Sequence, residues 1–376
     1  PDVIAYVDPK FKMPQVWRSN LNVDIQLPYD FMLSVGAMYT RDIYNVAQIN
    51  MNEAEPTGVY NEQPDRIYWA SKKYEYNDYT NGKNVVVKLS NGEDKGYQYS
   101  FNAILTKKYD FGFTGSIGYT YTMAKDLTAN PGSAPNSAWQ NNVAVNSLND
   151  PGVSYSLFST PHRIIANASY EINYAKCLKT TFSLFYSGYH TGRYSYTYYN
   201  DMNGDGNYSD LIYVPNSQDE MTFVDITDKS GAITYSAVDQ AKDFWDFVNN
   251  DSYLKDRKGK YVERNGSLTP WINRFDFKIA QDFYATLGGR KYGIQVSLDM
   301  LNVGNMINSK WGAYQSCGLK SYDNVQLLKT ASKVGEPLTY QINANSREAF
   351  KERSSWQYTN TIGSAWSMQL GVKVTF

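Results

Sequence analysis

The chain has 376 residues, and 36 Lys and Arg nearly balance 37 Asp and Glu, so it lacks the basic surface that binding to nucleic acid requires. Only two His and two Cys are present, which leaves little for histidine-based catalysis, zinc binding or a disulfide scaffold. No apolar run approaches the roughly 18 residues of a membrane-spanning helix, so a bundle of such helices is excluded.

Alternation of apolar and polar residues predicts nine long strands in a chain that also contains 34 Tyr. In chain order, these strands cover residues 16–27, 31–43, 96–106, 111–123, 162–173, 179–190, 271–284, 291–302 and 363–376. The alternation is strictest from Trp366 to Phe376, over 11 residues. Strands of soluble proteins usually have about 5–6 residues, whereas a tilted strand that crosses a membrane needs about 9–11.

The connections between these strands are alternately short and long. Short turns near Pro28, Lys108, Ala175 and Gly288 are followed by loops of roughly 50, 40, 80 and 60 residues, a pattern typical of outer-membrane barrels. Compact soluble domains rarely contain repeated long loops without structure. We therefore expect an all-β fold, a transmembrane antiparallel β-barrel with long extracellular loops, surrounded by lipid in the outer membrane of a Gram-negative bacterium.

The number of predicted strands is odd, whereas single-chain bacterial barrels have an even number because both of their termini lie in the periplasm. If the last strand ends at the periplasmic face, the first of the nine strands begins outside the cell. We therefore expect residues 1–376 to be the C-terminal portion of one larger barrel domain. Its N-terminal strands would precede Pro1, which also lacks the features of a natural translational start.

Several stretches resemble known transporters. The last strand, which ends in Phe376, is similar to the signal recognised by the machinery that assembles outer-membrane barrels. Residues 273–278 (NRFDFK), 298–303 (LDMLNV) and 305–308 (NMIN) resemble the final strands of TonB-dependent transporters. Four further motifs resemble the Oar-like branch of these transporters in Bacteroidetes, which is related in plan to SusC-type importers: residues 160–163 (TPHR), 195–198 (SYTY), 201–207 (DMNGDGN) and 210–215 (DLIYVP).

The resemblance implies a TonB-dependent receptor with a barrel of about 22 strands and an N-terminal plug domain, so that about 13 strands and the plug would lie upstream. It implies active import of a large or scarce nutrient, in which extracellular loops capture the ligand and TonB, acting through the missing N-terminal region, drives displacement of the plug. A surface lipoprotein on the extracellular loops is a further partner that we expect from this plan.

Two other classes of function stay open. A passive porin or channel of about 14–18 strands would share the strand pattern but would have no plug. A barrel enzyme would need a nucleophile and an orienting acid beside His162 or His190, and the sequence contains no Gly-x-Ser-x-Gly motif. The two histidines are expected to be polar residues near the membrane interface, so the chain is not expected to be an enzyme.

The loop after residue 190 contains a run with the spacing of a calcium-binding loop. The candidate ligands are Asp201, Asn203, Asp205, Asn207 and Asp210. Oxygen ligands at alternate positions can surround Ca²⁺, and Gly206 permits a sharp turn. The twelfth position is Ile212, where an EF-hand requires Glu, so this is not an EF-hand. A turn rich in Asn, Asp and Gly uses the same residues for backbone reasons, and that alternative stays open.

The same loop is rich in aromatic residues, which can form a surface for a ligand or a partner or can pack against each other within the loop. They are Tyr194, Tyr196, Tyr198, Tyr199, Tyr208, Phe244, Trp245 and Phe247, of which Tyr194, Tyr196, Tyr198, Tyr199 and Trp245 are the candidate contacts. Residues 237–249 are predicted to form a short helix. Cys177 lies in a predicted periplasmic turn and Cys317 in a predicted extracellular loop, so we expect them not to pair.

Overall fold

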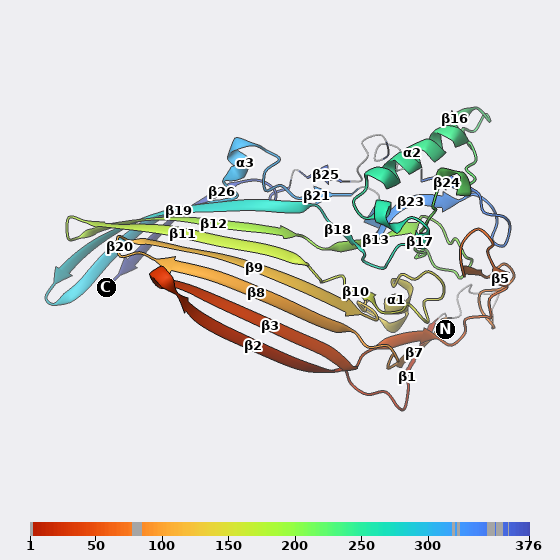
Figure 1. Ribbon diagram of the computed structural model, residues 1–376, viewed down its shortest axis with the longest axis horizontal. Coiled ribbons are helices and arrows are strands. Elements are labelled where there is room, and N and C mark those ends of the chain that lie inside the picture. Colours follow the sequence, from red (N-terminus) through yellow and green to blue (C-terminus); the bar gives the residue numbers. More distant parts are fainter. Residues whose placement is uncertain are drawn as a thin grey trace.

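A computed structural model describes residues 3–76, 85–317, 320–321, 324–343, 350, 356–359 and 361–376. The chain is composed mainly of strands, with few helices (Figure 1). The helices are α1 (Pro135–Gln140), α2 (Ala237–Asn250) and α3 (Gly304–Ile307), with short 3-10 helices η1 (Pro28–Asp30), η2 (Gln218–Glu220) and η3 (Leu254–Arg257). In the part of the chain that the structure describes, no helix has the length and apolar character needed to cross a membrane.

One large antiparallel sheet dominates the fold. In spatial order, its long strands are β2 (Gln15–Leu27), β3 (Phe31–Tyr44), β8 (Tyr97–Lys108), β9 (Phe113–Asp126), β11 (His162–Tyr174), β12 (Leu178–His190), β19 (Trp271–Leu287), β20 (Arg290–Leu301) and β26 (Ser367–Thr375). The short β10 (Ser154–Tyr155) also pairs with β9. The all-β class and the nine predicted strands are thus confirmed. The last strand begins later than predicted, because the carbonyl of Thr361 accepts the N–H groups of Ser364 and Ala365 in a turn.

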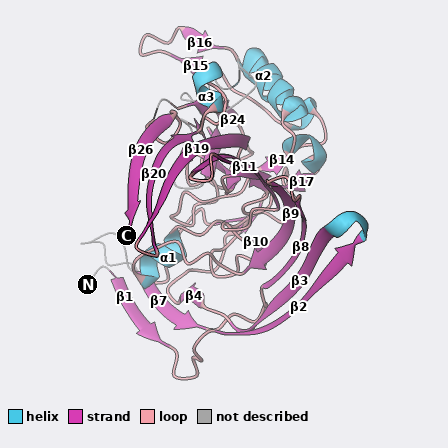
Figure 2. Cartoon of the chain, turned by 90° about the vertical axis from the view of Figure 1, so that its left-hand side faces the viewer, coloured by secondary structure: helices cyan, strands magenta, loops and turns pink. Residues whose placement is uncertain are grey.

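The sheet is open along its two edges. Its strands follow each other from β2 to β26, and within the described residues β2 pairs only with β3 and β26 only with β20. Seen along the strands, the sheet forms an arc (Figure 2). The short turns lie at one end of the long strands, and the long connections lie at the opposite end (Figure 1).

The tight turns have the backbone conformations that hairpins of long strands need. Gly288 and Gly289 have φ values of +58° and +77°, as in a type I′ turn, which fits the twist of two antiparallel strands. Ala175 and Lys176 join β11 to β12 with φ values of +51° and +54°. The register of each pair is fixed by its turn, so the side chains of all strands fall into rows across the sheet.

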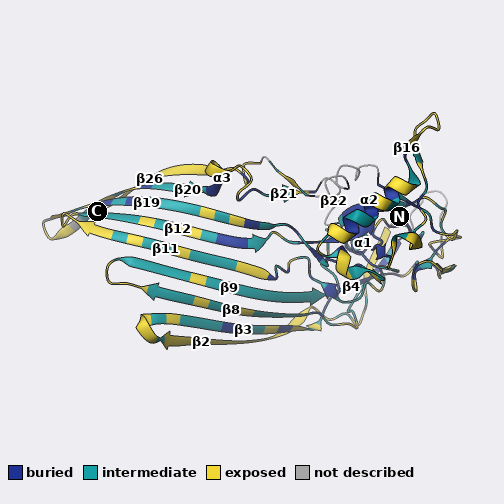
Figure 3. Cartoon of the chain, turned by 45° about the horizontal axis from the view of Figure 1, so that its top comes forward, coloured by how far each residue is buried: buried dark blue, intermediate teal, exposed yellow. Residues whose placement is uncertain are grey.

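The two faces of the sheet differ in polarity. One row on the first face consists of Ile25, Leu33, Leu105, Ile117, Ala166, Tyr186 and Phe275. One row on the opposite face consists of Thr114, Ser169, Ser183, Lys278, Asp299 and Gln369. Large side chains of the apolar face are exposed: Leu370 is 72% exposed and Ile117 is 54% exposed. The sheet therefore has one apolar and one polar face, and few of its residues are buried (Figure 3).

The long connections and the segment before β2 fold together into a loop assembly, defined here as residues 3–14, 45–96, 127–161, 191–270 and 308–359, so far as they are described. The loops are as long as predicted, but they are not structureless. They contain a three-stranded sheet of β1 (Val3–Val7), β7 (Val85–Ser90) and β4 (Ala47–Asn50), and a five-stranded sheet of β18 (Ser267–Leu268), β13 (Arg193–Tyr198), β23 (Asn324–Thr330), β22 (Lys320–Ser321) and β24 (Tyr340–Ile342). Two-stranded pairs are β5 (Gly58–Val59) with β6 (Ile67–Tyr68), β14 (Tyr213–Val214) with β17 (Lys260–Tyr261), β15 (Ile226–Thr227) with β16 (Ile233–Tyr235), and β21 (Gln315–Ser316) with β25 (Gln357–Tyr358).

The main hydrophobic core lies in the loop assembly and not in the large sheet. The predicted helix at 237–249 is confirmed as α2, and the side chain of Ser236 caps it by accepting the N–H of Asp239. On its inner face, Phe244, Phe247 and Val248 are buried against the five-stranded sheet. Four separate connections thus form one folded body at one end of the large sheet.

Candidate ligand and metal sites in the loop assembly

Three of the predicted aromatic contacts are buried. Tyr194, Tyr196 and Tyr198 lie in β13, the strand between β18 and β23, and their exposed fractions are 3%, 0% and 0%. The hydroxyl of Tyr196 donates to the carboxylate of Asp251 at 2.7 Å. Burial raises the pKa of Tyr194 to about 12 and that of Tyr196 well above its ordinary value. These residues therefore stabilise the loop assembly and do not form its surface, because β13 is covered on both faces.

The other two predicted aromatic contacts remain accessible. Tyr199 is exposed, directly after β13. Trp245 is half-buried on α2, packs against the core, and lies below the ammonium group of Lys258, which is 4.6 Å from its ring. A cation–π contact of this kind fixes the ring without removing it from solvent. The prediction of a ligand or partner surface stays a prediction, and only these two side chains of the five can contribute to it directly.

The candidate calcium loop is folded around its own backbone. The carboxylate of Asp201 accepts the N–H groups of Gly204 at 2.8 Å and Gly206 at 2.9 Å. The carboxylate of Asp205 accepts the N–H of Asn207 at 2.7 Å. Both glycines have positive φ, +82° and +94°, which other residues adopt at a cost. The loop therefore depends on the alternating acidic residues and on the two glycines for its shape.

The third acidic residue of the loop, Asp210, is tied to a buried arginine. Its carboxylate accepts the N–H of Met202 at 3.0 Å and lies 3.6 Å from the guanidinium of Arg66. Burial raises the pKa of Asp210 to about 7, against the opposing effect of Arg66. Burial, followed by the charges of Asp210 and Asp201, raises the pKa of Asp205 well above its ordinary value. The loop thus gathers three carboxylates, with Arg66 beside Asp210 and Lys73 close to Asp201 as the opposing positive charges.

The loop brings the five predicted ligands into one turn. Within the described ranges, no group of three or more His, Cys, Asp and Glu side chains is arranged to hold a metal ion. Two carboxamide nitrogens in the loop, Nδ2 of Asn203 and Nδ2 of Asn207, are buried without a hydrogen-bond partner. The binding of Ca²⁺ stays a prediction, because the side chains of Asp201, Asn203, Asp205 and Asp210 also accept backbone N–H groups and so have a structural role without the ion.

An uncharged groove of about 660 Å³ borders this loop. Its lining consists of Gln140, Asn141, Tyr199, Asn200, Gly206, Asn207, Tyr208, Ser209, Asn324 and Gln326. Tyr199 and Tyr208 are 47% and 65% exposed and present their rings, while the carboxamides supply hydrogen-bonding groups. The unpartnered Nδ2 of Asn207 belongs to this lining. The groove can therefore hold a neutral ligand through ring contacts and hydrogen bonds. The sequence pointed to Tyr199 but not to the carboxamides, which come from three distant segments.

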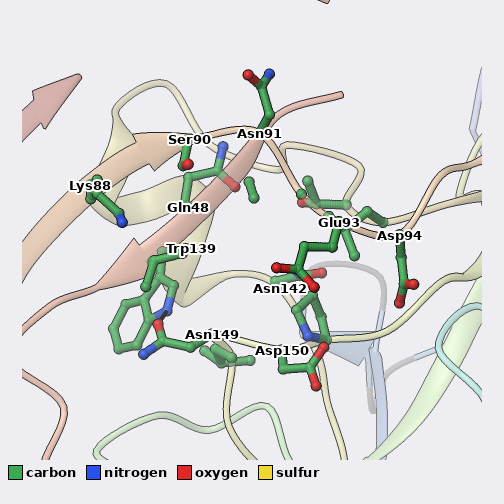
Figure 4. A pocket seen from close by; sticks show the side chains of 17 residues that line it. Gln48, Lys88, Ser90, Asn91, Glu93, Asp94, Trp139, Asn142, Asn149 and Asp150 are labelled. Atoms are coloured by element: carbon green, nitrogen blue, oxygen red, sulfur yellow. Dashed lines mark hydrogen bonds between the residues drawn. The ribbon is translucent and has the colours of Figure 1, made fainter. Parts of the chain in front are cut away.

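A second cavity, of about 460 Å³, lies between the three-stranded sheet and α1 (Figure 4). Glu93, Asp94 and Asp150 contribute three carboxylates to its lining, and Lys88 contributes one ammonium group. Figure 4 also shows Trp139, whose indole N–H donates to the side chain of Asn149 at 3.0 Å. The balance of charge favours a cationic ligand. Sequence reasoning did not identify this cavity, because its residues form no local motif.

The two histidines and the two cysteines lie in separate places. Nδ1 of His162 is 2.6 Å from the hydroxyl of Tyr119, and Nδ1 of His190 is 2.6 Å from the carbonyl oxygen of Thr269. Cys177 is free and exposed in the turn between β11 and β12. Cys317 is buried in the loop assembly.

Comparison of the chain with protein-family models, with curated proteins and with solved structures finds no significant match.

Proposed function

We propose that this chain forms part of the wall and the extracellular loops of an outer-membrane β-barrel. The observation that carries the proposal is the division of the large sheet into an apolar face and a polar face, in register across its strands. Because the apolar face is exposed, it needs a cover, and the length of the strands matches the hydrocarbon thickness of a bilayer. In this arrangement lipid contacts the apolar face, and the polar face lines the lumen.

The barrel would be completed by further strands. The edge strands β2 and β26 have exposed backbone and side chains along almost their full length. Unpaired edges of this length are a liability for a folded protein, and a bilayer has no water to satisfy their N–H and C=O groups. Closure by additional strands, to about 22 in total, removes both edges.

We propose further that the complete protein is a TonB-dependent transporter that imports a large or scarce nutrient. The support for this class is the resemblance of the motifs between residues 160 and 376 to the Oar-like branch of Bacteroidetes. In this proposal, the loop assembly faces the outside and captures the ligand, and the uncharged groove beside Tyr199 and Tyr208 is its contact surface. A plug outside residues 1–376 and TonB would then couple uptake to the proton-motive force, and a surface lipoprotein would act on the loops.

Cysteine labelling tests the membrane orientation. Ile233 is 59% exposed in the β15–β16 hairpin of the loop assembly, whereas Cys177 lies at the turn end. In intact cells that produce the full protein, a membrane-impermeant maleimide should label the Ile233→Cys variant, and it should label Cys177 only after the outer membrane is opened. Labelling of both sites in intact cells, or of neither site, would contradict a barrel in this orientation.

Conductance distinguishes active transport from a passive pore. A plugged transporter in a planar bilayer should show no steady current, whereas a porin conducts continuously. Uptake by cells should also stop when the proton-motive force is removed. Steady conductance of the full protein would favour the passive channel.

A further inference from the structure

The segment that follows β20 begins against the apolar face of the large sheet. α3 follows β20 and is placed alongside the sheet and not at its loop end (Figure 1). The N–H of Val303 donates to the carbonyl of Phe275 in β19 at 2.8 Å, which fixes the start of this segment on the sheet. Lys310, Trp311, Gly312 and Ala313 share one groove with Tyr186 and Phe275 of the apolar face, so this segment lies on the side of the wall that the proposed function assigns to lipid.

An open apolar groove of about 830 Å³ separates this segment from the sheet. Ala166, Leu184, Tyr186 and Phe275 form its floor, on the apolar face of β11, β12 and β19. Its other side is formed by Lys310, Trp311, Gly312, Ala313, Gln315 and Tyr358.

The polar atoms on the floor satisfy each other. The hydroxyl of Tyr186 and the indole N–H of Trp271 both donate to Oδ1 of Asn273, at 2.7 and 2.9 Å. Because these groups are paired, the floor of the groove presents mainly hydrocarbon and aromatic ring, and the polar side chains of Gln315 and Lys310 lie on its other side. A groove of this kind fits an alkyl chain better than a polar ligand.

The charge at the groove has one sign. Lys310 is the charged side chain in its lining, and no carboxylate contributes to the described part of that lining. The ammonium group of Lys310 lies 5.7 Å from the ring centre of Tyr358, which holds it at the mouth of the groove. Trp311, which is 53% exposed, also belongs to the lining. Aromatic and basic residues at the end of an apolar surface are typical of the interface between lipid headgroups and acyl chains.

We propose that this groove is a binding site for an anionic lipid, whose acyl chain lies between the sheet and residues 310–315 and whose negatively charged headgroup contacts Lys310. The inference rests on the proposed function, since it takes the apolar face to be the lipid-facing side of the wall. It adds a specific site, with a preferred headgroup charge, to a surface that would otherwise bind lipid without selection.

Native mass spectrometry of the full protein in detergent tests the site with two probes, dioleoylphosphatidylglycerol and dioleoylphosphatidylcholine. We expect the anionic lipid to be retained preferentially. The Lys310→Gln variant should weaken its binding about fivefold, which corresponds to about 1 kcal/mol for one basic residue at a lipid surface. The Ala166→Phe variant fills the floor of the groove and should abolish retention of the anionic lipid. The matched control is Lys229→Gln, which removes an exposed lysine between β15 and β16 and should change nothing.

Equal retention of the two lipids, or unchanged retention by Lys310→Gln and Ala166→Phe, would overturn the proposal. Reconstitution into vesicles of phosphatidylcholine alone separates this result from a failure of the proposed function. If the protein inserts into those vesicles but shows no preference in detergent, only the lipid site is wrong. If it does not insert, the membrane wall itself is wrong.

Discussion

Buried arginines connect segments of the loop assembly that are far apart in the sequence. The guanidinium of Arg66 donates to the carbonyl groups of Val145 and Leu211 and faces Asp210 at 3.6 Å. It also lies 4.8 Å from the ring centre of Tyr261. A guanidinium has five N–H donors in a fixed plane, so one side chain can satisfy main-chain carbonyls from several loops. This is how loops without long strands are held at defined positions.

Substitution of Arg66 by Met should therefore destabilise the loop assembly strongly. It removes the donors for two buried carbonyl groups and leaves the carboxylate of Asp210 buried without its partner. We expect a loss of about 3–5 kcal/mol in the free energy of unfolding, measured by denaturant titration. The control is Lys242→Met on the exposed side of α2, which should change the value by less than about 0.5 kcal/mol. Similar losses of unfolding free energy in the two variants would show that Arg66 does not stabilise the loop assembly.

The candidate calcium loop, residues 201–210, allows a direct test of calcium binding. Asp205 is buried in this loop. Tyr74 lies beside the loop, because its hydroxyl is 3.2 Å from the position that a Cβ atom on Gly206 would take. If the loop binds Ca²⁺, Tb³⁺ in the same site should luminesce on excitation of tyrosine, and Ca²⁺ should displace it and raise Tm. The Asp205→Asn variant should lose both responses, while Asp219→Asn, at an exposed position, should keep them. Identical melting in Ca²⁺ and in chelator would show that the loop is only a turn.

At the scale of elements, the long strands could be predicted because each repeats the same local pattern over many residues. The alternation of Ile294, Val296 and Leu298 with polar residues defines a strand wherever it packs. Likewise, Gly288 and Gly289 specify a tight turn from local conformational preference alone. Each of these features depends on neighbours in the sequence, so a single sequence contains enough information for it.

The loop assembly could not be predicted in the same way, because its contacts are not local. β13 pairs in parallel with β23, so that Ser195 lies opposite Asn324. Tyr194, Tyr196 and Tyr198 are buried by that pairing, although their spacing in the sequence is equally compatible with a surface. The groove beside Tyr208 likewise gathers carboxamides from α1, the acidic loop and β23. The sequence lists these groups but does not say which of them meet.

If the apolar face contacts lipid, as we propose, charged substitutions on the two faces of one strand should have different effects on stability. Ile117 and Ser116 are adjacent in β9 and lie on opposite faces of the sheet, where Ser116 is flanked by Thr106 and Asn167. In lipid, Ile117→Lys should lower the free energy of unfolding by about 2–4 kcal/mol near the bilayer midplane, because a charge is placed among acyl chains. Ser116→Lys should have a much smaller effect, because its side chain lies on the polar face, which would line the lumen of the proposed barrel. Urea unfolding in vesicles measures both, and equal losses would argue against one lipid-facing side.

At the scale of the whole molecule, stability has two different sources. The loop assembly has its own core, in which α2 and the five-stranded sheet bury large aromatic side chains. The large sheet has no comparable core, and its apolar face is exposed (Figure 3). Since burial of apolar surface is the main favourable contribution to folding, the sheet depends on a cover that its own residues do not provide. In the proposed barrel, lipid on its face and further strands on its edges would supply that cover together.

The edges therefore give the most general test of the proposed architecture. In β2 and β26, the N–H groups that do not bond β3 or β20 point outwards along both edges. If further strands pair there in the complete protein, hydrogen exchange in these two strands should be as slow as in β11 and β12, which have neighbours on both sides. Mass spectrometry of peptic fragments covering residues 15–27 and 367–375 measures this. Fast exchange in those fragments alone, with protection retained in β11 and β12, would mean that the sheet stays open and that no barrel is formed.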